Sequence, residues 1–191
     1  MIANDLRERI ERVRCEFVEI VPYDPRWPAR FVEERDRLHA LFPALIRRIE
    51  HFGSTAVPHL AAKPVVDMLV EVTSLEAAKV QAVPVLQRDG YDYFWRPSDG
   101  DDAPPFYAWF IRRNGEGQRT HHIHMVEPGY PQWESLLFRD YLIAHSDVAA
   151  AYEDLKRRLA IEFPHDREAY TNGKGEFIRR VTSMARSPAL T

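Results

Sequence analysis

The fold is decided by residues 50–72, which read EHFGSTAVPHLAAKPVVDMLVEV. A β-like segment runs into a turn of small residues, Gly53, Ser54 and Thr55, and a second apolar strand follows with Asp67 inside it. Glycine lets backbone N–H groups approach an anion closely, and the hydroxyl groups add further donors. A carboxylate within an apolar strand is costly unless it is paired or holds a metal. The stretch therefore predicts a phosphate and metal site between two strands.

Lys63 lies between the turn and the second strand and admits two interpretations. Its ammonium group can balance the charge of a bound phosphate. It can instead pair with Asp67 as a structural ion pair, which would satisfy the buried carboxylate without any ligand. Gly53 also has a purely structural interpretation, in which it only supplies a positive φ to the turn.

Composition narrows the class of protein. With 191 residues, 45% of them hydrophobic and 29% charged, the chain is long enough for one sizeable core. Its net charge of −3 makes a nucleic acid an unfavoured partner, because proteins that bind nucleic acids generally are usually basic. The single cysteine, Cys15, excludes an internal disulfide, and no apolar run reaches the ~18 residues of a membrane span. We therefore expect a cytoplasmic protein without a membrane partner.

Hydrophobic periodicity predicts one α+β domain over residues 17–184, with a charged N-terminal extension at 1–16 and a tail at 185–191. The expected strands are 16–22, 47–51, 91–95, 106–113 and 119–126, together with the apolar run around Asp67. The expected helices are 25–42, 75–88, 133–144, 148–163 and 168–184. Pro84 predicts a kink or an early end of the second helix, because proline lacks the N–H that a helix interior needs.

Two histidines in the last predicted strand form a second chemical group. His122 and His124 share one face of that strand, because side chains alternate across it. Two imidazoles at this spacing suit one metal ion. They could also contact phosphate as cations, transfer protons, or be hydrogen-bonded strand histidines without a ligand.

The helical third adds spaced basic groups: Arg139, Lys156 and Lys174. They either form a solvated helix face or point over the sheet at a polyanionic ligand.

An ordered set of motifs resembles the signature of the GrpB family, which belongs to the nucleotidyltransferase-like superfamily. In chain order the motifs are Tyr23-Asp24-Pro25-x-Trp27, His51-Phe52-Gly53-Ser54-Thr55-Ala56-Val57-Pro58, Lys63-Pro64-x-x-Asp67, His122-x-His124, Phe138-Arg139-Asp140-Tyr141-Leu142, Tyr152-x-x-x-Lys156 and Tyr170-x-x-x-Lys174. The resemblance covers roughly residues 17–182, nearly the whole chain.

The resemblance implies a mixed β-sheet flanked by helices, with a helical C-terminal third. In active members of the superfamily, the glycine-serine turn contacts a nucleotide triphosphate, and carboxylates on the next strand hold divalent metal. Carried over by position, Gly53 and Ser54 form the turn and Asp67 is the first carboxylate. The second carboxylate is missing, because that position is Leu69.

The residue roles implied in this way form three sets. The catalytic set is Asp67 and Lys63, and the phosphate-binding set is Gly53, Ser54, Thr55, Lys63, Arg139, Lys156 and Lys174. The metal set is Asp67, His122 and His124. Its imidazoles favour zinc or manganese over magnesium, which prefers oxygen ligands.

Two functions from different classes follow. One is metal-dependent transfer of a nucleotidyl or phosphoryl group to an unknown small acceptor. The other is a non-catalytic domain that binds a nucleotide or a phosphorylated small molecule, as an accessory or protein-interaction domain like the GrpB-like domain fused to some dephospho-CoA kinases. Leu69 favours the second function, because a single carboxylate cannot form a two-metal clamp.

Overall fold

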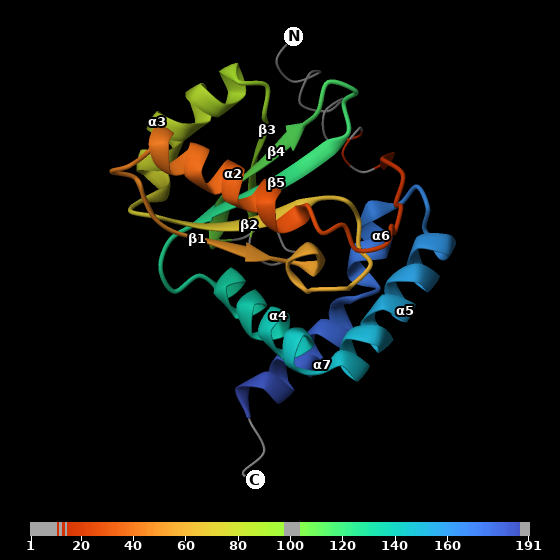
Figure 1. Cartoon of the computed structure of the whole chain (residues 1–191). Coiled ribbons are helices and arrows are strands. Elements are labelled where there is room, and N and C mark those ends of the chain that lie inside the picture. The colour runs from red at the N-terminus through yellow and green to blue at the C-terminus, as the bar shows by residue number, and fades with distance from the viewer. Residues whose placement is uncertain (1–10, 12, 14, 98–103, 188–191) are drawn as a thin grey trace.

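A five-stranded mixed sheet organises the chain, as a computed structural model that describes residues 11, 13, 15–97 and 104–187 shows (Figure 1). The strands are β1 (Ile46–Phe52), β2 (Val66–Val72), β3 (Asp92–Pro97), β4 (Phe106–Arg113) and β5 (Arg119–Val126). Their order across the sheet is β1-β2-β5-β4-β3. The β2–β5 pair is parallel and the other three pairs are antiparallel.

The two faces of the sheet differ because side chains alternate along each strand. On β2, Met68 and Val70 belong to the large core formed with helix α2 (Trp27–Leu41) and helix α3 (Leu75–Arg88). Asp67 and Leu69 lie on the opposite face, which helices α2 and α3 leave uncovered. The chemistry of the predicted site therefore faces away from the main core.

Four helices make up the C-terminal third and lie beyond the β1 side of the sheet (Figure 1). They are α4 (Ser135–Ala144), α5 (Ser146–Glu162), α6 (Arg167–Asn172) and α7 (Gly175–Arg186). Two 3₁₀ turns precede strand β2 and helix α4: η1 (Ser54–Ala56) and η2 (Pro131–Glu134). These observations confirm the predicted fold class, a mixed sheet flanked by helices with a helical C-terminal third.

Three predicted elements need correction. The strand expected at 16–22 is wrong, because only Val21 forms an isolated bridge, to Ala62. The chain before it contacts the helical third instead, where Val18 N–H donates to the carbonyl of Pro164 at 2.8 Å. Helix α3 does not end at Pro84 but continues to Arg88. Buried Ala82 and Leu86 on either side hold that turn against the core.

The single helix expected at 168–184 is two helices, because α6 ends at Asn172 and α7 begins at Gly175. The expected N-terminal extension lies largely outside the described residues, as does the middle of the loop between β3 and β4.

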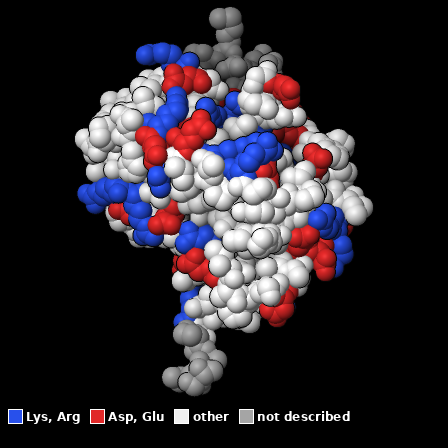
Figure 2. Space-filling view, viewed as in Figure 1, with Lys and Arg blue, Asp and Glu red and all other residues white. Residues whose placement is uncertain are grey.

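Among the residues that the structure describes, no helix combines the length and the apolar character needed to cross a bilayer. On the face shown in Figure 2, lysine and arginine side chains alternate with acidic ones and form no continuous basic surface.

A buried carboxylate fastens helix α2 to the sheet. Glu34 is fully buried and accepts hydrogen bonds from the Tyr91 hydroxyl and, at 2.5 Å, from Nη1 of Arg112 on β4. A carboxylate in an apolar core is stable only with such partners.

We predict that Glu34→Ala lowers the free energy of unfolding by about 2 kcal/mol, because it leaves the buried Tyr91 hydroxyl without its acceptor and the partly exposed Arg112 guanidinium without its counter-charge. Urea denaturation followed by circular dichroism measures the change. The matched control is Glu33→Ala on the exposed side of the same helix. An equal effect of the two substitutions would contradict the assigned role of Glu34.

Candidate functional site

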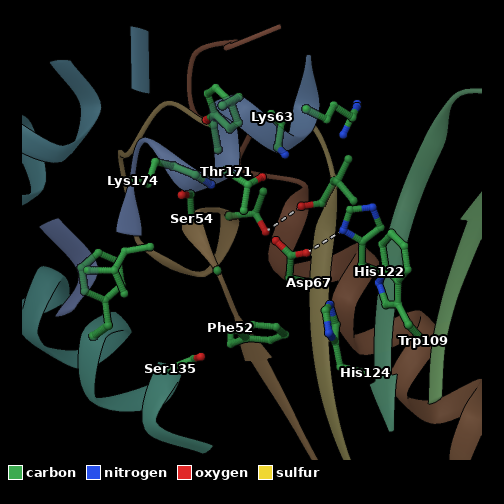
Figure 3. Close-up of a pocket in the computed structure, with 18 of the residues that line it drawn as sticks. Phe52, Ser54, Lys63, Asp67, Trp109, His122, His124, Ser135, Thr171 and Lys174 are labelled. Carbon is green, nitrogen blue, oxygen red and sulfur yellow. Dashed lines mark hydrogen bonds and ion pairs between the residues drawn. The ribbon is translucent and has the colours of Figure 1, made fainter. Parts of the chain in front are cut away.

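A cavity of about 690 Å³ lies between the uncovered face of the sheet and the C-terminal helices. Figure 3 shows side chains from the strands, the η1 turn and helices α4 and α6 converging on it. Its lining includes most of the predicted site residues: Gly53, Ser54, Thr55, Lys63, Asp67, His122, His124, Arg139 and Lys174. Its volume is within the usual range of small-molecule sites.

The register of β2 against β5 places Asp67 directly opposite His122. Nδ1 of His122 lies 2.9 Å from Oδ1 of Asp67, the pair joined by a dashed line in Figure 3. The other ring nitrogen, Nε2, lies 3.3 Å from Nη1 of Arg119, which can only donate. The neutral tautomer with its proton on Nδ1 satisfies both contacts. His122 therefore orients the Asp67 carboxylate within the cavity.

Protonation states follow from burial and from these contacts. Burial raises the pKa of Asp67, but the hydrogen bond from His122 and nearby positive charge lower it further, to about 2. Burial lowers the pKa of His122 to about 4 and that of His124 to about 3. Near neutral pH the site therefore holds one carboxylate and two uncharged imidazoles.

Gly53 is required where Asp67 meets the turn. Its φ is +73°, and a Cβ atom there would lie 2.4 Å from Oδ2 of Asp67. Both the backbone conformation and the space exclude a side chain. Thr55 stabilises the same turn, because its buried hydroxyl donates a hydrogen bond to the carbonyl of Val65 at 3.2 Å.

Two lysines converge on one aromatic ring in the cavity wall. Nζ of Lys63 lies 4.9 Å and Nζ of Lys174 lies 4.6 Å from the ring centroid of Tyr170. Within the described part of the chain, neither ammonium group has a carboxylate within 4.0 Å, and Asp67 bonds to His122, not to Lys63. Burial and the charge of Lys174 lower the pKa of Lys63 well below its usual value. Burial lowers that of Lys174 to about 8.

Arg139 and Lys156 make hydrogen bonds to other parts of the protein at the edges of the site. Arg139 lines the cavity, but its Nη1 donates to the carbonyl of His51 at 2.8 Å and to Glu50 at 3.1 Å. Lys156 lies outside the cavity lining, and its buried ammonium group donates to the carbonyl of Ala61. The loop that carries Lys63 is thereby attached to helix α5.

Sequence reasoning missed several lining residues: Phe52, Trp109, Arg119, Arg167, Thr171 and Asn172. Arg119 and Arg167 both contact Glu16, Arg167 through Nη2 at 3.6 Å. The repeated Tyr-x-x-x-Lys spacing indicated that the segment around Tyr170 belongs to the site. No local sequence feature predicts that Arg167 or Trp109 lines the cavity. Their places depend on tertiary packing.

Asp67, His122 and His124 also form a group that could hold a metal ion. Each offers one ligand atom, and these atoms lie within 4.8 Å of one another. The charged carboxylate and neutral imidazoles are in the protonation states that a cation needs.

Comparisons with known proteins show which family this chain matches. The family model described as "GrpB protein" matches residues 17–184. The chain is 34% identical over 166 residues to the glutamate-rich protein GrpB of Alkalihalophilus pseudofirmus, covering 86% of this chain and 93% of that protein. A crystal structure of the conserved protein GrpB from Enterococcus faecalis has a TM-score of 0.74 and 32% identity, covering 87% of this chain and 96% of that one.

Longer relatives contain a similar region. The chain is 40% identical over 170 residues to the UPF0157 protein YqkA of Bacillus subtilis, covering 88% of this chain but about half (47%) of that protein. It is 31% identical over 181 residues to a dephospho-CoA kinase of Mycolicibacterium paratuberculosis, covering 85% of this chain and 44% of the kinase.

We predict that Gly53→Ala lowers the free energy of unfolding by about 1–3 kcal/mol, because the new methyl group meets Asp67 at a left-handed backbone position. Chemical denaturation measures the loss. Gly115→Ala is the control, since a Cβ atom there has no neighbour within 4 Å. Similar stability of the two variants would refute the close approach.

We also predict that stability falls as the pH decreases from about 6.5 toward 4. Burial lowers the pKa of His51, His121 and His122 to about 4 and that of His124 to about 3, so the unfolded chain takes up protons before the folded one does. The free energy of unfolding should fall by about 1.4 kcal/mol per pH unit for each histidine.

The measurement is urea denaturation at pH 7, 6 and 5. His121→Gln should make the fall shallower by one histidine's share, whereas His165→Gln, which removes an exposed ring, serves as the control. Asp67 titrates below this window and does not affect the result. A stability that is constant between pH 7 and 5 would contradict the prediction.

Proposed function

The chain belongs to the GrpB family, and on that premise we propose that its cavity binds a phosphorylated small molecule. A nucleotide is the class that the family resemblance implies. The cavity holds the ligand between the η1 turn and helix α6. The proposal concerns binding, and transfer chemistry is a second candidate treated below.

The observation that carries this proposal is the pair of ammonium groups that both lie within 5 Å of the ring centroid of Tyr170. Lys63 and Lys174 are half-buried, and the charge of Lys174 makes a charge on Lys63 more costly, yet the described residues give neither lysine a carboxylate within ion-pair distance. Such an arrangement is unfavourable in an empty site. A phosphate group between the two lysines would supply the missing negative charge and accept charge-assisted hydrogen bonds.

The surroundings of the lysines suit the same ligand. Ser54 lines the cavity from the η1 turn, and Thr171 and Asn172 line it from helix α6. Figure 3 shows Ser54, Thr171, Lys63 and Lys174 gathered at one end. Hydroxyl and amide donors beside two cations are the groups that contact phosphate oxygens in proteins.

The second candidate is metal-dependent transfer, and the group formed by Asp67, His122 and His124 favours it. The charged Asp67 carboxylate and the uncharged His124 fit a divalent cation. His122 fits only if it gives up a contact, because its nitrogens face Asp67 and Arg119. A bound metal would neutralise phosphate charge. Leu69, fully buried against the aromatic residues of β4, occupies the place of a second acid.

An accessory role is compatible with binding alone. The relative named dephospho-CoA kinase contains this region as less than half of its length. We propose that in such settings the domain supplies a binding site beside another domain.

We predict that the double variant Lys63→Met/Lys174→Met lowers the affinity for ATP, GTP, CTP, UTP or inorganic tripolyphosphate at least tenfold. The same variant should be more stable than the unmodified chain without ligand, because two half-buried cations without a counter-charge are gone. Isothermal titration calorimetry and urea denaturation measure the two effects.

The matched control is Arg158→Met on the exposed side of helix α5, outside the cavity. If none of these compounds binds the unmodified chain, the proposed function is wrong.

The metal candidate is tested in the same titrations with Mg²⁺, Mn²⁺ or Zn²⁺. Binding of one of these ions that disappears in Asp67→Asn but persists in Asp154→Asn would support it, and equal binding in both variants would refute it.

A further inference from the structure

The cavity has an aromatic end opposite its two lysines. Rings from four strands line it: Phe52, Phe94, Trp95, Trp109 and His124. Figure 3 shows Phe52, Trp109 and His124 together on the sheet side, away from Lys63 and Lys174. The phosphate-binding function proposed above makes no use of this end.

Trp109 carries an unsatisfied hydrogen-bond donor. The residue is 94% buried, since its relative exposure is 6%, and no described residue accepts a hydrogen bond from its buried Nε1. In contrast, Nε1 of Trp133 donates to the carbonyl of Glu127 at 3.2 Å. A buried donor without an acceptor is costly, and proteins usually supply a partner.

The position of this donor links it to the cavity. Among the described residues, buried side-chain atoms that have neither a hydrogen bond nor an ion pair occur in Trp27, Trp109 and Gln132. Trp109 is the member of this set that lines the cavity. The missing acceptor can therefore come from a molecule bound there.

The neighbours of Trp109 indicate the shape of that molecule. The Arg96 guanidinium lies 4.7 Å from the Trp109 ring centroid, and the His122 ring stands nearly edge-on at 5.2 Å. Phe52 and His124 are also edge-to-face, at 5.1 Å. Walls built from rings and a planar cation favour a planar, polarisable group over an aliphatic one.

We infer that the ligand carries, besides its phosphate, a planar ring with a hydrogen-bond acceptor, which packs at the aromatic end and accepts a hydrogen bond from Nε1 of Trp109. This inference rests on the proposed function, because the phosphate at Lys63 and Lys174 fixes the opposite end of the ligand. A nucleobase has both required features, whereas inorganic tripolyphosphate has the charge without the ring.

The test compares ATP and UTP with inorganic tripolyphosphate by calorimetry on the full chain. The better nucleotide should bind at least tenfold more tightly than tripolyphosphate, since stacking of one base contributes about 1–3 kcal/mol. Trp109→Phe should reduce nucleotide affinity about tenfold and leave tripolyphosphate affinity unchanged, which also shows that the variant folds. Trp133→Phe, outside the cavity, is the matched control.

A second measurement needs no variant with an altered cavity. The indole N–H signals of the unmodified chain are followed by ¹H–¹⁵N NMR, and the Trp109 signal should shift with the nucleotide but not with tripolyphosphate. Equal affinities for nucleotide and tripolyphosphate, or an unchanged Trp109 signal, would overturn this inference and leave the proposed function in place. Failure of every phosphorylated compound to bind would overturn both.

Discussion

The parallel pairing of β2 with β5 is the constraint on which the site depends. In its register Asp67 faces His122, and a shift by one residue would turn the histidine to the opposite face of the sheet. The half-buried carboxylate would then lose the hydrogen bond from its donor, which is unfavourable. The same register places His124 one pair further along, opposite Leu69. The strand that carries the acid and the strand that carries the imidazoles therefore define the cavity floor together.

The rest of the site comes from parts of the chain that are far apart in sequence. The turn at Gly53 packs directly on the carboxylate, and helix α6 brings Arg167 and Tyr170 over it. The loop between η1 and β2 is held by helix α5 at a single residue, because Glu153 accepts a hydrogen bond from Ala61 N–H at 2.8 Å and Lys156 donates to the carbonyl of Ala61. The position of Lys63 thus depends on contacts made about 90 residues later in the chain.

The sequence predicts local features of the fold well. Alternation and apolar runs located all five strands of the sheet, and the Gly53 turn and the half-buried Asp67 were recognised from their residue types alone. Pairing could not be read in the same way: nothing local shows that β2 and β5 are parallel. The early helix end considered at Pro84 does not occur, because packing of the neighbouring residues outweighs the loss of one helical hydrogen bond.

The candidate site was less predictable than the fold. Lys156 and Lys174 have the same Tyr-x-x-x-Lys spacing. Lys174 lies in the cavity wall, whereas Lys156 donates a hydrogen bond to a backbone carbonyl. Lys156 lies inside helix α5 and Lys174 lies at the junction of α6 and α7, a difference that the spacing does not encode. For the same reason Trp109 could be recognised as apolar but not as a donor without an acceptor.

The attachment of Ala61 to helix α5 has a consequence for how this domain evolves. The sheet could not be passed unchanged to another protein without the C-terminal helices, because the loop beside the cavity would lose both of its hydrogen bonds to helix α5. A gene fusion or duplication that ended near residue 130 would carry strands without a working pocket. Selection should therefore keep the region from the Asp67 strand to helix α7 as one heritable unit, and the near-complete matches to much longer relatives have the extent that such a unit requires.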